Sequence, residues 1–168
     1  IVPAQTHAAT AHAVELAGAK PVFVDSENET GNIDIDRIED FITERTRAIS
    51  IVHYLGMPVD MERVCAIASR RGLKVIEDCA LALGTYYKGT HAGLFGDAGC
   101  FSFYPVKHMT TAEGGMLITK HQQIAAGIGR EKAFGVDRTH TERNVPGTYD
   151  VTMLGFNYRM SEVHCAIG

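Results

Sequence analysis

The chain has 168 residues, of which 45% are hydrophobic and 21% are charged, so it is long enough to build one well-packed soluble domain. Its formal net charge of −4 provides no basic footprint for nucleic acid, and we expect no such partner. No apolar run approaches the roughly 20 residues that cross a bilayer, and the first residues do not resemble a signal peptide. Composition therefore argues against membrane and nucleic-acid-binding proteins and favours a cytoplasmic one.

Strand-like and helix-like patterns alternate through the first half of the chain. Apolar β-branched runs predict strands at 22–25, 48–52 and 73–77, and apolar residues at helical spacing predict helices at 34–43 and 61–71. Asp60 is the expected N-cap of the second helix. This βαβ series predicts an α/β fold, a three-layer sandwich in which helices cover both faces of a mainly parallel sheet.

The second half continues with a turn at 86–89, strands at 99–103 and 115–119, and a helix at 122–131. A long loop at 135–150 has the length of a functional loop, and Ser161 is a candidate N-cap for a helix that runs to Ile167. Glycines 93, 96 and 99 do not form G-x-G-x-x-G, so we interpret them as turn and packing glycines. The four cysteines form no C-x-x-C pair, which predicts buried free thiols in a reducing compartment.

Lys107 is the first candidate for chemistry, because it follows directly on a short apolar run. A primary amine at the mouth of a sheet can form a Schiff base with an aldehyde cofactor. Asp78 ends the strand at 73–77, and in an open α/β sheet ligands bind at the carboxyl ends of the strands. Ser102 lies at the end of another strand and can donate to a phosphate. Pyridoxal 5'-phosphate needs these three groups: an amine, an acid for its ring nitrogen and donors for its phosphate.

Each residue also has an ordinary structural interpretation. A single lysine is most often a solvated surface residue, and Asp78 could cap a helix or accept hydrogen bonds from backbone amides. Glu77 and Asp78 could together hold Mg²⁺, but the chain has no G-x-x-x-x-G-K-[ST] loop for nucleotide phosphates.

Four motifs resemble the DegT/DnrJ-type sugar aminotransferases, which are fold-type I, aspartate-aminotransferase-like pyridoxal phosphate enzymes. They are Val-Ile-Glu-Asp at 75–78, Gly-Cys-Phe-Ser-Phe-Tyr-Pro-Val-Lys-His at 99–108, Glu-Gly-Gly at 113–115 and Asn-Tyr-Arg-Met-Ser-Glu at 157–162. The resemblance implies that 1–168 is part of the large cofactor-binding domain, with an N-terminal segment and a small C-terminal domain outside it.

The resemblance also implies a reaction and an assembly. Lys107 would hold pyridoxal phosphate, and an amino acid, glutamate by family expectation, would donate nitrogen to the keto group of a nucleotide-linked sugar in amino-sugar biosynthesis for cell-surface polysaccharide or secondary metabolites. Asn157 and Arg159 would reach the phosphate region of the partner subunit, which implies a homodimer with shared active sites. His7 lies where the family places an aromatic side chain on the cofactor ring; it could stack there, or be a polar histidine at a strand end.

One departure concerns the cofactor pocket. The family usually has glutamine three residues after the aspartate and often histidine two residues further, where this chain has Leu81 and Leu83. Loss of one hydrogen bond to the cofactor would cost about 1 kcal/mol, which weakens binding without abolishing it.

Two alternatives stay open: a pyridoxal phosphate enzyme acting on a non-nucleotide ketone, as in aminocyclitol or aminoarene synthesis, and a non-catalytic regulatory relative. A branch of the family that dehydrates sugars replaces the lysine with histidine, and Lys107 argues against it.

Overall fold

The computed structural model describes residues 1–138, 140–142 and 144–168. The chain divides into two compact units, Ile1–Lys120 and His121–Gly168, and each is described by itself.

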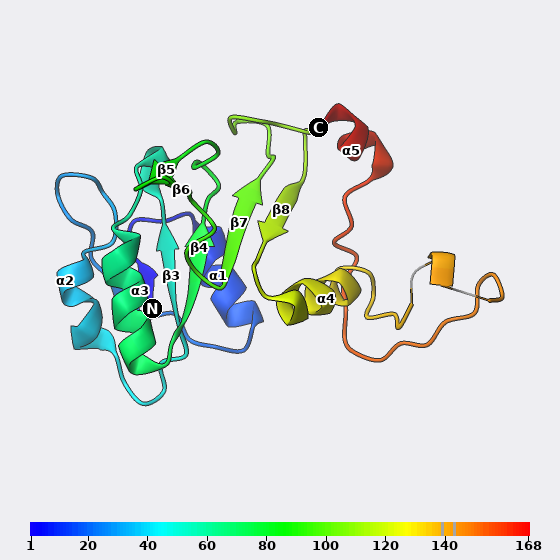
Figure 1. The fold of residues 1–168 in the computed structure, drawn as a ribbon, viewed down its shortest axis with the longest axis horizontal. Helices are drawn as coiled ribbons and strands as arrows, with labels where there is room; N and C mark the ends of the chain where they lie inside the picture. The colour runs from blue at the N-terminus through cyan, green and yellow to red at the C-terminus, as the bar shows by residue number, and fades with distance from the viewer. Residues whose placement is uncertain (139, 143) are drawn as a thin grey trace. The chain divides into compact units, whose positions relative to one another are not determined.

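The first unit is built on a four-stranded sheet in the order β3 (Ala48–Val52), β4 (Lys74–Asp78), β7 (Ala98–Ser102) and β8 (Gly115–Ile118) (Figure 1). The first three strands are parallel and β8 is antiparallel to β7. The α/β fold with a mainly parallel sheet is thus confirmed, and the predicted strand positions are correct to within one or two residues.

A second pair of parallel strands, β1 (Val2–Pro3) and β2 (Phe23–Val24), extends this sheet beyond β3. The terminal amino group of Ile1 donates to the carbonyl of Ala48 at 2.9 Å, and the amide of Ser50 donates back to Ile1 at 2.9 Å. This alternation is the hydrogen-bond pattern of a parallel pair, so β1 lies beside β3.

Two helical segments cover one face of the sheet. In α3 (Met61–Arg71), apolar residues recur every three or four positions and four of them are buried, while Asp60 accepts from the amide of Arg63 as the predicted N-cap. The helix expected at 34–43 is shorter than predicted: α2 (Ile35–Ile38) passes into the 3₁₀ turn η1 (Glu39–Phe41), and Ile42 is extended. Glu39 and Asp40 in that turn are repelled by the negative, C-terminal end of the helix dipole, which disfavours a longer helix.

The core lies between these helical segments and the sheet. Its members are apolar and buried: Val24, Ile33, Ile35, Ile38, Ile49, Ile51, Val59, Met61, Val64, Ile67, Ala68 and Val75. On the strands these side chains alternate with residues on the other face, as the period of a β-strand requires.

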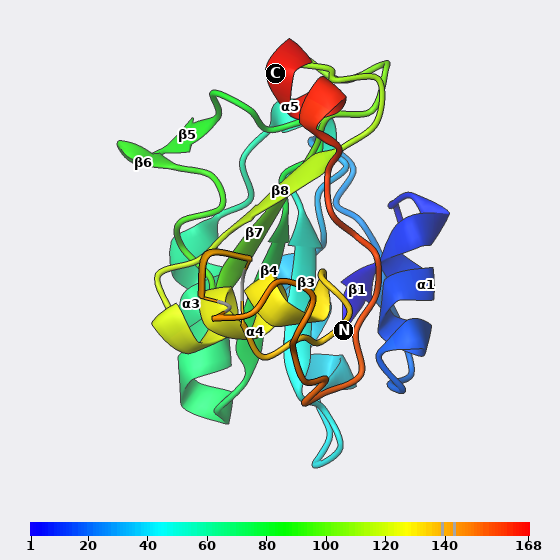
Figure 2. The same cartoon turned by 90° about the vertical axis from the view of Figure 1, so that its right-hand side faces the viewer.

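The other face of the sheet carries α1 (Ala8–Leu16), which lies on the opposite side from α3 (Figure 2). This helix was not predicted, because its alanine-rich sequence lacks an apolar stripe at helical spacing. None of its residues is buried, and Ile76 on the same face of β4 is 39% exposed. Helices therefore lie on both sides of the sheet, and among the described residues the buried apolar core lies on the side of α2 and α3.

Two smaller predictions are corrected in part. The turn at 86–89 is flanked by short antiparallel strands, β5 (Tyr86–Tyr87) and β6 (Thr90–His91), because Lys88 and Gly89 both adopt positive φ, the geometry of a tight hairpin. All four cysteines are free thiols, but only Cys79 is buried and Cys165 is exposed.

The second unit contains α4 (Gln122–Glu131), which has the predicted bounds, the short 3₁₀ turn η3 (His140–Glu142) and α5 (Glu162–Ile167). Ser161 caps α5 as predicted, accepting from the amide of His164. The predicted loop at 135–150 is closed at its base, where the amide of Asp137 donates to the carbonyl of Asp150 at 2.9 Å. Residues 139 and 143 of this loop lie outside the described residues. In the part of the chain that the structure describes, no helix has the length and apolarity needed to cross a membrane.

Candidate active site

Two of the predicted site residues lie at the carboxyl ends of neighbouring parallel strands. Asp78 is the last residue of β4 and pairs with Cys100 of β7, and Ser102 follows two residues later on β7. Paired residues share a face of a sheet, and so do residues two apart on one strand. Asp78 and Ser102 therefore lie on one face of the sheet, the face opposite the buried apolar core.

The Asp78 carboxylate has one oxygen engaged and one available. Its Oδ1 accepts a hydrogen bond from the amide of Ala80 at 2.9 Å, which agrees with the ordinary interpretation of this residue. No cationic side chain among the described residues forms an ion pair with it, and no hydrogen bond to Oδ2 occurs there. The half-buried carboxylate can thus accept a cationic partner at Oδ2 without losing its own support.

Lys107 lies in the loop that joins β7 to β8. The base of this loop is closed by the amide of Phe103, which donates to Gly114 at 2.9 Å, and by the amide of Thr111, which donates to Phe103 at 3.0 Å. The amide of Lys107 donates to the carbonyl of Tyr104 at 3.0 Å, so the lysine sits in a turn. Its half-buried side chain forms no ion pair with any residue that the structure describes.

Ser102 and His7 both make local contacts with the backbone. The hydroxyl of Ser102 accepts a long hydrogen bond, 3.3 Å, from the amide of Tyr104, and its proton is left for another acceptor. His7 is the N-cap of α1, where its Nδ1 accepts from the amide of Ala9 at 3.1 Å. Capping was not foreseen for His7, and its stacking on a cofactor stays a prediction.

Asn157 and Arg159 belong to the second unit. Within that unit, Arg159 Nε donates to Asn157 Oδ1 at 3.2 Å. The guanidinium of Arg159 also lies over the ring of Phe134, 5.1 Å from its centroid. These two residues support each other, and their place in a partner's site stays a prediction.

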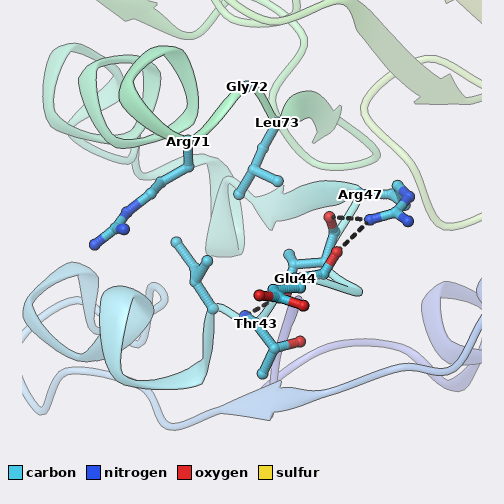
Figure 3. Close-up of a pocket in the computed structure, with 8 residues that line it drawn as sticks. Thr43, Glu44, Arg47, Arg71, Gly72 and Leu73 are labelled. Atoms are coloured by element: carbon cyan, nitrogen blue, oxygen red, sulfur yellow. Dashed lines mark hydrogen bonds between the residues drawn. The ribbon is translucent and has the colours of Figure 1, made fainter.

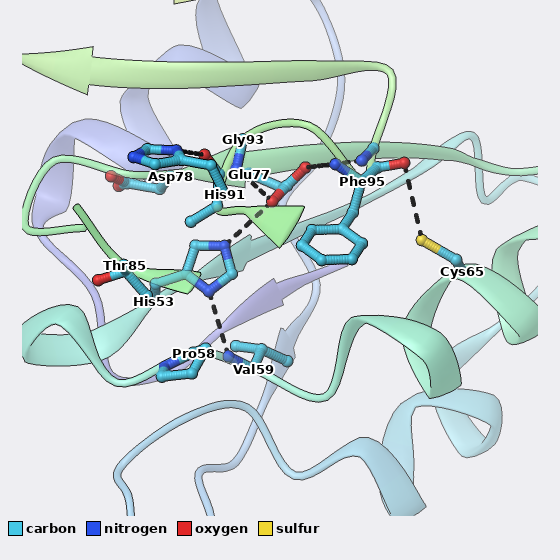
Figure 4. A network of polar contacts seen from close by, with 12 residues as sticks. His53, Pro58, Val59, Cys65, Glu77, Asp78, Thr85, His91, Gly93 and Phe95 are labelled. Carbon is cyan, nitrogen blue, oxygen red and sulfur yellow. Dashed lines mark hydrogen bonds and ion pairs between the residues drawn. The ribbon is translucent and has the colours of Figure 1, made fainter. Parts of the chain in front are cut away.

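A buried polar network lies on the face of β4 opposite Asp78, and the sequence did not predict it (Figure 4). Glu77 is fully buried, and its carboxylate accepts four hydrogen bonds: from His53 Nε2 at 3.1 Å and from the amides of Gly93, Phe95 and Gly96 at 2.6, 2.9 and 2.6 Å. Burial alone opposes ionisation of Glu77, but the hydrogen bonds from His53, Gly96 and Gly93 together outweigh it and hold the pKa of this carboxyl below its ordinary value. The carboxylate is therefore ionised inside the core.

The geometry of His53 defines which ring nitrogen carries its proton. Nδ1 accepts a hydrogen bond from the amide of Val59 at 3.1 Å, so this nitrogen must have a free lone pair. The proton then lies on Nε2 and is donated to Glu77. His53 is consequently neutral, and the pair carries one net negative charge.

Glycines allow the 93–96 segment to approach β4 and β7 closely enough to reach Glu77. A Cβ on Gly96 would lie 2.6 Å from the carbonyl oxygen of Val75, and one on Gly99 would lie 2.4 Å from Gly93 Cα. Both contacts are with backbone and are too short for any side chain. The interpretation of these residues as packing glycines is confirmed.

His53, Glu77 and Cys79 also place three potential metal ligands within 4.8 Å of one another. A metal would need a free imidazole lone pair and a thiolate. Nδ1 is engaged with Val59, Nε2 carries the proton, and burial, together with the charges of Glu77 and Asp78, raises the pKa of the Cys79 thiol. We therefore interpret the cluster as a hydrogen-bonded network and not as a metal site.

A surface hollow of about 520 Å³ lies at the other end of the strands (Figure 3). Its lining includes residues that directly precede β3 and β4, so it is at the amino ends of these strands. Arg47 there donates to the carbonyls of Glu44 and Thr46, and Arg71 is paired with Glu39. Both guanidinium groups already have partners, and we assign no ligand to this hollow.

The donor set at the carboxyl ends fits pyridoxal phosphate. Asp78 offers a carboxylate oxygen for the ring nitrogen, Ser102 a hydroxyl proton for the phosphate, and Lys107 an amine without an ion pair for the aldehyde. The side chains of Leu81 and Leu83 are apolar and offer no such group. Leu83 is 44% exposed, and the backbone of Leu81 packs closely on Gly56, where an added Cβ would lie 2.8 Å from the Leu81 carbonyl oxygen.

Comparison with known proteins supports this interpretation. Residues 1–168 match the model of the DegT/DnrJ/EryC1/StrS aminotransferase family. The chain is 42% identical to a GDP-perosamine synthase of Escherichia coli O157:H7 over 168 residues, which is 100% of this chain and 44% of that protein.

Solved structures match as well, over nearly the whole chain. An aminotransferase from Psychrobacter cryohalolentis has a TM-score of 0.92 at 36% identity, covering 99% of this chain and 44% of that one. DesI, determined in the presence of its TDP-sugar product, has a TM-score of 0.85 at 36% identity, covering 99% and 40%. The chain thus spans less than half the length of these relatives. Enzymes of the family use pyridoxal 5'-phosphate, and the chain belongs to the DegT/DnrJ/EryC1/StrS aminotransferase family.

Proposed function

We propose that the full-length protein containing this chain is a pyridoxal phosphate-dependent aminotransferase that transfers an amino group to the keto group of a nucleotide-linked sugar. The observation that carries the proposal is a pair of groups without an ion-pair partner among the described residues, the Asp78 carboxylate at the end of β4 and the Lys107 amine in the loop after β7, in a chain that matches the family throughout. In this proposal, residues 1–168 form part of the large cofactor-binding domain.

Each residue has a defined task. Pyridoxal phosphate, when bound, supplies a conjugated ring that accepts electrons as a proton leaves the α-carbon of the amino donor. Asp78 Oδ2 would keep a proton on the ring nitrogen, and Ser102 would donate its hydroxyl proton to the phosphate. Lys107 would hold the cofactor through its side-chain amine and, when that amine is free, would carry the proton that leaves the α-carbon of the donor.

The relatives support the choice of acceptor. One is named for the synthesis of GDP-perosamine and another was determined with its TDP-sugar product, so both names refer to nucleotide-linked sugars. We propose glutamate as amino donor, a cytoplasmic location, and a role in amino-sugar synthesis for lipopolysaccharide, other cell-surface polysaccharide or secondary metabolites.

We further propose a homodimer in which Asn157 and Arg159 of each subunit approach the phosphate site of the other. The hydrogen bond between them and the packing of Arg159 on Phe134 hold both polar groups in one arrangement. Pre-ordered side chains lose less entropy when they bind an anion, which suits a phosphate contact supplied by a partner subunit.

Covalent attachment is the first experiment. The full-length protein is incubated with pyridoxal phosphate, reduced with borohydride and digested, and the labelled peptide is identified by mass spectrometry. We expect the label on Lys107 in the wild type and none on that peptide in Lys107→Ala. Lys20→Ala is the matched control, because Lys20 is exposed and belongs to no predicted site; it should label like the wild type.

Turnover is tested separately with glutamate and a panel of GDP- and TDP-linked keto-hexoses, measuring 2-oxoglutarate. A product with the nucleotide-linked sugars supports the proposal. Labelling of Lys107 with turnover of free cyclic ketones alone would favour the aminocyclitol or aminoarene alternative. If Lys107 is never labelled at saturating cofactor, the enzyme proposal is wrong and a non-catalytic relative remains.

A further inference from the structure

The buried Glu77 carboxylate is more polar than core packing requires. The residues that share its face on β3 and β4 are the apolar Ile49, Ile51 and Val75, all buried. A carboxylate in such a place is tolerated only when its oxygens are fully hydrogen-bonded, and apolar residues of similar size are often as stable. Glu77 satisfies this condition, because its carboxylate accepts four hydrogen bonds. The segments that carry the four donors are therefore held in place by this carboxylate.

The four donors join three segments around the end of β4. His53 belongs to the turn that follows β3, whereas Gly93, Phe95 and Gly96 belong to the segment that precedes β7. β3 and β7 are the two neighbours of β4 in the sheet. Glu77 therefore ties its own strand to segments on both sides, one residue before Asp78.

Asp78 depends on the same segments for its main-chain support. Its carbonyl accepts from the amide of His53 at 3.1 Å, it pairs with Cys100, and the next amide, that of Cys79, donates to the carbonyl of Cys100 at 2.8 Å. Its side chain is anchored only through Oδ1 to Ala80 among the described residues. A shift of the β3 turn or of β7 would therefore turn the Asp78 carboxylate as well.

The two carboxylates also act on the same region electrostatically. Burial raises the pKa of the Cys100 thiol, and the charges of Asp78 and Glu77 raise it further. Because His53 is neutral, the charge of Glu77 is not cancelled by its partner. Both negative charges consequently favour a cation at the end of β4.

We propose that Glu77, held by His53 and by the 93–96 amides, is a positioning residue that orients Asp78 toward the cofactor's ring nitrogen and adds a second negative charge behind it. This inference rests on the proposed function. Glu77 does not touch the cofactor in this arrangement, because it projects from the opposite face of β4.

The test uses the full-length protein and two readouts other than turnover: the affinity of the apoprotein for pyridoxal phosphate, and the ¹⁵N resonance of the ring nitrogen in protein reconstituted with ¹⁵N-labelled cofactor. Glu77→Gln removes the charge and leaves one acceptor oxygen for four donors. We expect cofactor affinity to fall roughly ten- to hundredfold, by analogy with the loss found when residues that orient metal ligands from behind are replaced. The ¹⁵N resonance should move toward that of the unprotonated ring.

His53 provides a milder pair of variants. His53→Leu removes both imidazole hydrogen bonds but leaves Glu77 with its three amide donors, and should change both readouts in the same direction by less. His53→Gln, whose amide can again donate to Glu77, should restore them in part. This pair decides the question if Glu77→Gln is not recovered folded.

Asp97→Asn is the matched control for lost stability. Asp97 accepts from the amide of Val75 at 2.9 Å and pairs with Lys74, so it supports the start of the same strand. The control should lower the melting temperature without moving the ¹⁵N resonance or the cofactor affinity by more than about twofold. The proposal would be overturned if Asp97→Asn changed the cofactor affinity and the ¹⁵N resonance as much as the Glu77 or His53 variants do. It would also be overturned if both readouts were unchanged in folded Glu77→Gln or His53→Leu.

Failure of the proposed function gives a different result. If the wild type binds no pyridoxal phosphate, or if Asp78→Asn leaves the ¹⁵N resonance in place, the site itself is misassigned. If Asp78→Asn moves the resonance and folded Glu77→Gln does not, only the positioning role is wrong.

Discussion

Gly99→Ala should destabilise the protein strongly, although it adds a single methyl group. The new Cβ would lie 2.4 Å from Gly93 Cα and 2.7 Å from Gly93 O, whereas ordinary contacts begin near 3.4 Å. Relief requires the 93–96 segment to move away by about 1 Å, since neither atom belongs to a flexible side chain. The 2.6 Å hydrogen bond from Gly93 to Glu77 would then exceed the usual hydrogen-bond limit.

The cost follows from these two effects. Overpacking of a well-packed interior costs about 1–3 kcal/mol, and loss of a hydrogen bond to a charged group costs about 1.5–3 kcal/mol. We therefore expect Gly99→Ala to lower the free energy of unfolding by about 2.5–6 kcal/mol, measured by urea denaturation of the full-length apoprotein.

The matched control is the same substitution in open space. Gly127 lies inside α4 with nothing within 4 Å of an added Cβ. Alanine is a better helix former than glycine, so Gly127→Ala should stabilise α4 by about 0.5–1 kcal/mol. A Gly99→Ala protein within about 1 kcal/mol of the wild type would show that the segment moves freely and would refute the argument from close approach.

Three further predictions concern charge, capping and packing. The pKa of Glu77 in the folded protein lies below its ordinary value of 4.5. The ionised carboxylate therefore stabilises the fold above pH 4.5, and this stabilisation is lost as the pH falls through the folded-state pKa. Acid unfolding curves should show the loss in the wild type and not in Glu77→Gln. Asp60→Ala removes the N-cap of α3 and should cost about 1 kcal/mol by urea denaturation, whereas an unchanged midpoint would mean that water replaces the cap. Ile51→Ala empties a fully buried site and should cost about 2–5 kcal/mol, whereas Ile167→Ala, at a residue 60% exposed, should stay within about 0.5 kcal/mol; equal effects would place the core elsewhere.

Local sequence patterns predicted most strands and four helices of the first and second units, one of them, at 34–43, longer than the structure has it. The helix at 61–71 was predicted with its correct bounds, because it has an apolar stripe and an N-cap aspartate. The strand at 48–52 was also correct, since its β-branched residues alternate between faces. The helix 8–16 was missed, because an alanine-rich segment without a buried stripe carries no periodic signal.

The candidate site divides in the same way. The position of Asp78 at a strand end could be read from an apolar run that stops at a carboxylate, and the strand register then places Ser102 on the same face. The family prediction, which used longer motifs, is confirmed over the whole chain. The roles of Lys107, His7, Asn157 and Arg159 stay predictions.

The sequence by itself determined the α/β class, the positions of most strands, the family and the residues with suitable chemistry, because these depend on periodicity and on motifs a few residues long. Only the tertiary structure decided that Glu77 is an ionised core residue, that His53 is its neutral partner, and that the 93–96 segment supplies three amides. Partners 16 to 24 residues apart are brought together by strand order and by glycines that permit close approach, and no local pattern encodes such contacts.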